Sequence, residues 1–143
     1  MSDRSSIRIM IADDFMLLRK VIRLYLRRAK DLEVVDEVPD LDDALARTQT
    51  LQPDVVIMND YLPPIDSAHA AHHFRQQGFS GGILVISMKL ELEQMQRSFE
   101  NGVTGFMNKD EIQDHLVEAV RCVHTGQRYL SPKVNEVYSP SKE

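Results

Sequence analysis

Acidic, hydroxyl and ammonium side chains that together could hold a phosphoryl group follow separate apolar runs of this chain. Asp13 and Asp14 come directly after one run, Ser87 ends another, and Lys109 follows a third. Two adjacent carboxylates suit a hard divalent cation such as Mg²⁺, which prefers oxygen ligands and keeps several of its waters. A lysine can neutralise an anion, and a serine hydroxyl can donate a hydrogen bond to it. These residue types predict phosphoryl binding by metal, lysine and hydroxyl, if the fold brings them together.

The stretch 53–63 contains the strand that should bring them together. Residues 55–58 are all apolar and β-branched at the start, as expected for a strand that is buried on both faces of a parallel sheet. Asn59 and Asp60 follow this run, so they should lie at the carboxyl edge of the sheet. In open α/β sheets ligands bind at that edge, where the strand order reverses.

Predicted strands and helices alternate along the rest of the chain. Apolar runs predict strands at 7–11, 32–38, 83–86 and 103–107, and helical spacing predicts a helix after each of the five strands. The strand at 32–38 carries three acids and the strand at 103–107 is weak, so we place both at edges. The pattern predicts an α/β fold, a doubly wound five-stranded parallel sheet with strand order 2-1-3-4-5.

This strand order determines which polar residues meet. With right-handed crossovers, all five strands end along one edge, and the first and third strands lie side by side. Asp13 and Asp14 then face Asn59, and Ser87 and Lys109 approach from the other side. The acidic pair alone could as well cap a helix, so it is the combination that indicates a site.

The composition is typical of one acidic globular domain. The 143 residues carry a net charge of −5 and one cysteine, Cys122, so no internal disulfide can form. We expect a reducing, cytoplasmic setting, and neither a membrane span nor a signal peptide is indicated by any long apolar run. The negative charge argues against DNA binding by this domain alone.

The chain resembles the receiver domain of two-component response regulators, which has a CheY-like fold. The resemblance covers almost the whole chain and rests on four motifs: Ile11-Ala12-Asp13-Asp14, the stretch 53–63, Ser87, and Phe106-Met107-Asn108-Lys109-Asp110. The ending 126–134 is further similar to the NarL/FixJ subfamily, in which a LuxR-type helix-turn-helix follows the receiver. The resemblance implies a receiver domain at residues 1–130, and we expect residues 131–143 to form a C-terminal tail or the start of a linker.

The resemblance also implies roles for the residues of the site. Asp13 and Asp14 would form the acidic pair that binds Mg²⁺, with Asp14 as a direct ligand and the backbone carbonyl of Tyr61 as another. Ser87 would be the switch hydroxyl and Phe106 the switch aromatic. A phosphate-sensing lysine is expected as well, and it corresponds to residue 109.

The phosphoacceptor position departs from the family pattern, because the residue four positions before Pro63 is Asn59 rather than an aspartate. An amide is not a carboxylate nucleophile and cannot form an acyl phosphate. Asp60 is adjacent, but alternation along a strand should point its side chain to the opposite side. We expect the chain as written to be non-phosphorylatable and its Mg²⁺ binding to be weakened. Asn59 is either the natural residue of an atypical receiver or an introduced Asp-to-Asn change, which the codon in the source gene distinguishes.

The partners that the resemblance implies are those of a signalling module. A sensor histidine kinase or a phosphotransfer protein would act on the site, and a homodimer is a further assembly to consider. DNA would be contacted only through a C-terminal helix-turn-helix domain, and no membrane contact is expected. We do not expect an enzyme, although family receivers catalyse their own phosphotransfer. The alternative is a stand-alone interaction module that works without phosphorylation.

Three rival kinds of site fit the sequence less well. A phosphatase of the haloacid dehalogenase type needs Asp-x-Asp, whereas the two acids here are adjacent. A flavodoxin-like flavin site needs a loop rich in Ser, Thr and Gly after the first strand, and residues 15–17 are Phe-Met-Leu. His69, His72 and His73 have a helical spacing that could hold zinc, but no cysteine or carboxylate nearby completes a structural set.

Overall fold

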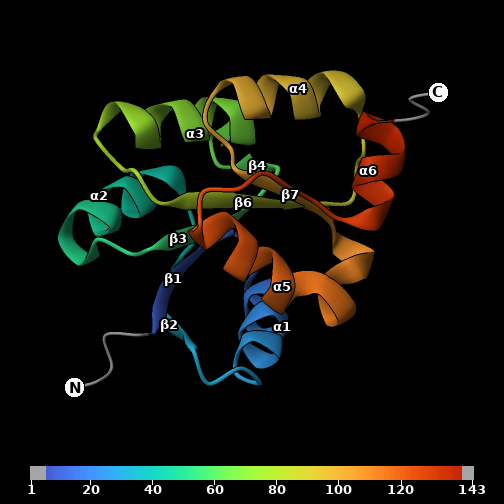
Figure 1. Ribbon diagram of the computed structural model, residues 1–143. Helices are drawn as coiled ribbons and strands as arrows, with labels where there is room; N and C mark the ends of the chain where they lie inside the picture. The colour runs from blue at the N-terminus through green and yellow to red at the C-terminus, as the bar shows by residue number, and fades with distance from the viewer. Residues whose placement is uncertain (1–5, 140–143) are drawn as a thin grey trace.

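The computed structural model describes residues 6–139, and its centre is a parallel β-sheet (Figure 1). The strand order is β2-β1-β3-β6-β7-β8, and every neighbouring pair is parallel. The strands are β1 (Ile7–Ala12), β2 (Leu32–Val38), β3 (Val55–Asn59), β6 (Gly82–Ser87), β7 (Gly105–Asn108) and β8 (Tyr129–Leu130). The predicted order 2-1-3-4-5 is confirmed for the first five of these strands.

Helices cover both faces of the sheet, as expected for a doubly wound fold. Figure 1 shows α1 and α5 below the sheet and α3 and α4 above it. The helices are α1 (Met16–Leu26), α2 (Leu41–Leu51), α3 (Ser67–Gln76), α4 (Leu92–Glu100), α5 (Ile112–His124) and α6 (Pro132–Tyr138). A short hairpin of β4 (Tyr61–Leu62) and β5 (Ile65–Asp66) and the 3₁₀ turn η2 (Lys109–Glu111) complete the elements. No helix within residues 6–139 has both the length and the apolar character needed to cross a bilayer.

The central strands contribute to two apolar cores, one on each side of the sheet. Ile11 of β1 and Ile57 of β3 pack with α1 and α5, whereas Met10 and Met58 pack on the opposite side with α2, α3 and α4. All four side chains are at most 1 % exposed. Burial on both faces is the reason that β3 is continuously apolar until the strand ends at Asn59.

Two of the three acids of β2 are paired with arginines from the neighbouring helices. Glu37 forms ion pairs with Arg19, at 3.3 Å, and with Arg23, both from α1. Asp36 forms an ion pair with Arg47 of α2 at 2.7 Å. These contacts allow a polar strand to occupy the edge of the sheet, where the sequence predicted it.

The second predicted edge, the strand at 103–107, is not at the edge. β8 pairs with the outer side of β7, where the Tyr129 N–H donates to Thr104 O at 3.1 Å and the Ser131 N–H donates to Phe106 O at 3.2 Å. The sheet therefore has six strands rather than the predicted five. Two residues are too few to produce an alternating pattern, so β8 left no recognisable signal in the sequence.

The stretch 131–143, expected to be a tail or the start of a linker, begins with a helix that packs on the domain. Helix α6 starts at Pro132, whose fixed φ and missing N–H suit the first helical turn. Val134 is completely buried in the core on the α2, α3 and α4 side. The boundary expected at residue 130 is therefore corrected, because residues 131–138 belong to the folded domain.

We expect Val134→Ala to lower the free energy of unfolding by about 1–3 kcal/mol, because it removes buried methyl groups and leaves a cavity. The matched control is Asn135→Ala on the exposed side of α6, which should change the free energy by less than about 0.5 kcal/mol. Urea unfolding of both variants measures the difference. Equal stabilities would mean that α6 does not contribute to the core.

Candidate functional site

The register of the parallel strands aligns the ends that carry the predicted site residues. The paired residues at these ends are Ala12 with Met58, Asn59 with Ile86, and Ser87 with Asn108. Asp13, Asn59, Ser87 and Lys109 lie at these ends or directly after them, so they share the carboxyl edge of the sheet, as the sequence predicted.

A hollow of about 380 Å³ opens at this edge, and Asn59 and Lys109 both line it. Asp60 and Tyr61 also line the hollow, whereas Ser87 is completely buried next to it. A larger hollow of about 730 Å³ includes Asp54 in its lining and lies at the opposite edge of the sheet, away from the predicted residues. The smaller hollow is therefore the candidate site.

Asp13 is buried and held in one orientation, whereas Asp14 is exposed. Asp13 Oδ1 accepts a hydrogen bond from the Phe15 N–H at 2.9 Å. Burial raises the pKa of the Asp13 carboxyl above its ordinary value of 3.8, and the charge of Asp14 raises it further. The Phe15 N–H and the positive charges of Lys109 and Arg19 act on the pKa in the opposite direction. The positive charge of Lys109 therefore favours the ionised form of the buried Asp13 carboxyl.

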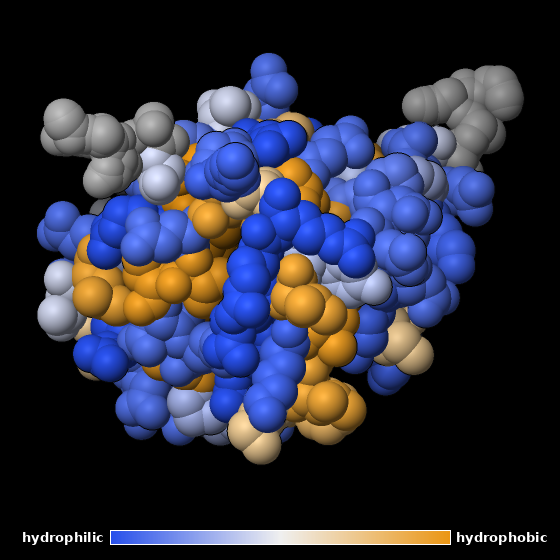
Figure 2. All heavy atoms as spheres, turned by 90° about the horizontal axis from the view of Figure 1, so that it is seen from below, coloured by the Kyte–Doolittle hydropathy of each residue, from blue (hydrophilic) through white to orange (hydrophobic). Residues whose placement is uncertain are grey.

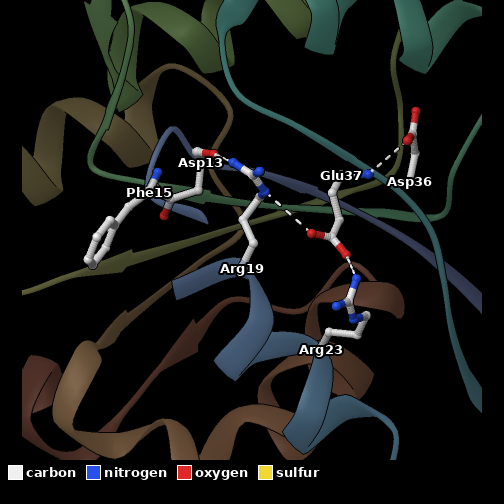
Figure 3. Close-up of polar contacts among 6 residues, drawn as sticks. All are labelled: Asp13, Phe15, Arg19, Arg23, Asp36 and Glu37. Atoms are coloured by element: carbon white, nitrogen blue, oxygen red, sulfur yellow. Dashed lines mark hydrogen bonds and ion pairs between the residues drawn. The ribbon is translucent and has the colours of Figure 1, made fainter. Parts of the chain in front are cut away.

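Arg19 fixes the backbone that carries the acidic pair. Figure 3 shows its guanidinium between Asp13 and Glu37. Arg19 Nη1 donates to Asp13 O at 2.5 Å, and Nε donates to Glu37 Oε1 at 3.3 Å. Glu37 of β2 thus helps to position the turn after β1.

The oxygen donors at this edge fit a hard divalent cation, although the set is small. Asp13 and Asp14 supply two carboxylates, but no group of three His, Cys, Asp or Glu residues poised for a metal is found within residues 6–139. An amide oxygen at Asn59 is a neutral donor, so it attracts a cation less than the carboxylate of an aspartate. The direct ligand roles of Asp14 and of the Tyr61 carbonyl stay predictions.

The three histidines of α3 do not form a metal site in the described part of the chain. His69 Nδ1 lies 2.8 Å from Asp66 Oδ1, an oxygen that also accepts the His69 N–H at 3.0 Å. Asp66 therefore caps the start of α3, and His69 is engaged with this cap. The structure gives the zinc alternative no support.

The orientation expected for Asp60 is wrong. Strand β3 ends at Asn59 and the chain bends at Asp60, so strand alternation no longer determines where this side chain points. Asp60 Oδ2 accepts a hydrogen bond from Ser87 Oγ at 2.7 Å. Asn59 Oδ1 accepts the Asp60 N–H at 2.9 Å, which holds the bend. The carboxylate of Asp60 consequently lies at the hydroxyl of Ser87 rather than on the opposite side of the strand.

Asn108 is a site residue that sequence reasoning missed. Its side chain is 5 % exposed, and its Nδ2 donates to Ser87 O at 3.3 Å. Its Oδ1 accepts the Asp110 N–H at 3.0 Å and so caps η2, the turn that begins with Lys109. The signal was a polar side chain at the end of a buried strand, directly before the lysine.

Phe106 is completely buried on the face of β7 toward α4. Its ring centre lies 6.4 Å from that of Phe99, in a tilted arrangement. The structure shows this single inward position of Phe106. Its role as a switch stays a prediction.

Comparison with protein families agrees with this geometry. The model of the response regulator receiver domain matches residues 9–121. The chain therefore belongs to the response regulator receiver domain family.

Curated relatives place the chain in the NarL/FixJ subfamily. The oxygen regulatory protein NreC of Staphylococcus carnosus is 33 % identical over 89 % of this chain and 59 % of NreC. The response regulator GacA of Pseudomonas aeruginosa is 30 % identical over 90 % of this chain and 60 % of GacA. The chain thus spans about three fifths of the length of these relatives.

Solved structures show the same fold. A two-component response regulator of the LuxR family from Aurantimonas sp. SI85-9A1 superposes with a TM-score of 0.89 at 29 % identity, covering 94 % of this chain and 96 % of that one. The signal receiver domain of a Mycobacterium tuberculosis response regulator named NarL gives a TM-score of 0.81 at 27 % identity, covering 86 % and 99 %. The CheY-like fold is confirmed.

We expect Asp13→Asn to raise the free energy of unfolding at pH 7 by about 0.5–2 kcal/mol when divalent cations are chelated. Because the folded pKa of Asp13 lies above 3.8, the folded state binds the proton more tightly than the unfolded state. The Asp13 carboxyl therefore contributes most to the free energy of unfolding at low pH, and this contribution is lost as the pH rises from 3.8 through the folded pKa. An asparagine has no such dependence.

Urea unfolding between pH 3 and pH 8 measures this difference. The control is Asp42→Asn, which changes an exposed acid in the first turn of α2. The control should not gain stability at pH 7, because a negative charge near a helix N-terminus is favourable. An Asp13→Asn variant no more stable than the parent at pH 7 would mean that Lys109 and Arg19 fully compensate for burial.

Proposed function

We propose that this chain is the receiver module of a longer transcription regulator and that it signals without a phosphoryl group at position 59. The observation that supports this most directly is the position of Asn59. It ends β3 and lines the hollow that Lys109 shares, which is where the family places its aspartate. If this assignment holds, the position of the acceptor carries an amide instead of a carboxylate.

The chemistry of phosphoryl transfer explains why the amide matters. In a receiver, a carboxylate oxygen bonds to the phosphorus of the donor while the bond from phosphorus to the donor's leaving group breaks. The amide oxygen of Asn59 carries no full negative charge, and its nitrogen lone pair is delocalised. Asn59 therefore does not form an acyl phosphate, although Lys109 is in position to neutralise an anion.

Mg²⁺ would be held by Asp13, Asp14 and the Tyr61 carbonyl and would supply positive charge opposite a phosphoryl group. Replacing a third carboxylate by an amide removes a Coulomb attraction of up to about 4 kcal/mol per charge pair, most of it offset by desolvation. We expect the Asn59→Asp variant to bind Mg²⁺ at least about tenfold more tightly. Calorimetric titration of both forms tests this, and equal affinities would contradict it.

The partners proposed here follow from the same assignment. A histidine kinase or phosphotransfer protein would dock beside the acidic pair, where Phe15, Met16 and Leu17 are each more than half exposed. Figure 2, which views the molecule from below, shows separate apolar patches divided by hydrophilic side chains. DNA would be contacted through a further domain, since the chain spans only part of the transcriptional regulators it resembles, and the setting would be cytoplasmic. A second copy of the chain is a further possible partner. The alternative function is a stand-alone interaction module that works without phosphorylation.

The phosphorylation experiment compares the chain as written with Asn59→Asp after incubation with acetyl phosphate and Mg²⁺. Intact-mass spectrometry should show no adduct on the chain as written and one phosphoryl group on Asn59→Asp, because only the variant has the carboxylate. The control is Asn59→Ala, which also lacks an acceptor. A stable adduct on the chain as written, or none on Asn59→Asp with Mg²⁺ bound, would contradict the proposal.

A further inference from the structure

Asp60 provides a carboxylate where the buried hydroxyl of Ser87 needs an acceptor. Ser87 Oγ lies 2.7 Å from Asp60 Oδ2 and 2.9 Å from Lys89 O, and it also accepts the Lys89 N–H at 2.9 Å. A hydroxyl has one proton and can donate to only one of the two oxygens. The carboxylate is both closer and charged, and charge-assisted hydrogen bonds are the stronger kind. Ser87 therefore donates to Asp60.

Buried hydrogen bonds continue from Ser87 to the start of α6. Asn108 Nδ2 donates to Ser87 O at 3.3 Å, and the Asn108 N–H donates to Ser131 Oγ at 3.1 Å. Ser131 is completely buried and precedes the first residue of α6. Its carbonyl accepts the Asn135 N–H at 2.8 Å, which is the first bond of the helix. The N-terminus of α6 is thus connected to Ser87.

The turn that carries Lys109 also holds the first turn of α6. Glu111 Oε2 accepts the Lys133 N–H at 3.1 Å, so this carboxylate satisfies a free donor at the helix N-terminus. Lys133 Nζ lies 3.2 Å from Asp110 Oδ2. A movement of the turn η2 would therefore act directly on α6.

The other end of α6 rests on aromatic side chains that reach Phe106. The rings of Tyr138 and Phe99 have centres 5.3 Å apart, and Phe99 in turn contacts Phe106. The guanidinium of Arg128 lies 4.3 Å from the ring centre of Phe99 and donates to Tyr138 Oη at 3.2 Å. Both ends of α6 are consequently linked to residues that the family uses as its switch.

We propose that Asp60 is an internal anion that replaces a phosphoryl group as the partner of Ser87, and that this contact keeps α6 seated on the domain. The inference rests on the proposed function, because Asn59 leaves the site without a covalent anion. Helix α6 has a seated and a released arrangement, and Asp60 biases the equilibrium toward the seated one. Asp60 is a positioning residue, and any domain attached after residue 139 would receive a signal state that does not depend on phosphorylation.

The test measures amide hydrogen exchange in α6, relative to exchange in α1, for the whole 143-residue chain, for four variants of the contact between Asp60 and Ser87, and for one control variant. Asp60→Ala and Ser87→Ala should each accelerate exchange in α6 about threefold to thirtyfold, the usual range for coupling along a contiguous network. The double variant should be no faster than either single variant, because both changes remove the same hydrogen bond. Asp60→Asn retains a neutral acceptor for the hydroxyl and should give a smaller change than Asp60→Ala.

The matched control is Asp40→Ala, which removes the side-chain cap of α2 and lowers stability without touching the contacts to α6. In this control variant, amide hydrogen exchange in α6 relative to α1 should be the same as in the parent chain. Asp60→Ala behaving like this control, or the two single effects adding in the double variant, would overturn the inference.

Mass spectrometry of the same samples after incubation with acetyl phosphate separates the two proposals. A phosphoryl adduct mapped to Asp60 would overturn the inference as well, because Asp60 would then be a nucleophile. An adduct at any other residue would contradict the proposed function and leave the exchange result to decide the role of Asp60.

Discussion

The parallel strands end together at one edge of the sheet, and the rest of this structure depends on that constraint. Strands β1, β3, β6 and β7 are buried on both faces, so their register is fixed by packing, and their carboxyl ends have to meet. Asp13, Asn59, Ser87 and Lys109 gain their common edge from this register alone. The cost is seen at Asp13, because burial raises the pKa of its carboxyl and the adjacent charge of Asp14 raises it further.

Under the proposed function, the negative charge of the site lies one residue further along the chain than the family pattern has it. Asn59 would then occupy the acceptor position without a charge, whereas the carboxylate of Asp60 accepts the hydrogen bond of Ser87. The bend after β3 makes this possible, because a carboxylate within the strand would have pointed away. The displaced charge still reaches a hydroxyl that is connected through Asn108 and Ser131 to the C-terminal helix. A receiver of this kind has the means to hold one state without covalent modification.

The features predicted correctly from the sequence are those that a long apolar pattern specifies. The features that were missed depend on one or two residues or on a single tertiary contact. Apolar runs and their spacing gave the alternating fold, the strand order and the residues at the carboxyl edge. Strand β8 was missed because two residues carry no periodicity, and α6 was taken for a linker because its one buried anchor, Val134, gives no helical pattern. The orientation predicted for Asp60 was wrong because it depends on where β3 ends. Strand boundaries are set by tertiary contacts, such as the hydrogen bond from the Ser67 N–H to Asp60 O at 2.8 Å.

Beryllofluoride offers the most direct measurement of whether Asn59 has removed the covalent acceptor, because beryllium must bond to a carboxylate oxygen to mimic the phosphoryl group. Two-dimensional ¹H–¹⁵N NMR spectra of the chain as written, recorded with Mg²⁺ already present, should show no further change at the amides of Ser87, Asn108 and Lys109 when beryllofluoride is added, whereas Asn59→Asp should show saturable shifts there. Saturable shifts at these amides in the chain as written would contradict the loss of the acceptor.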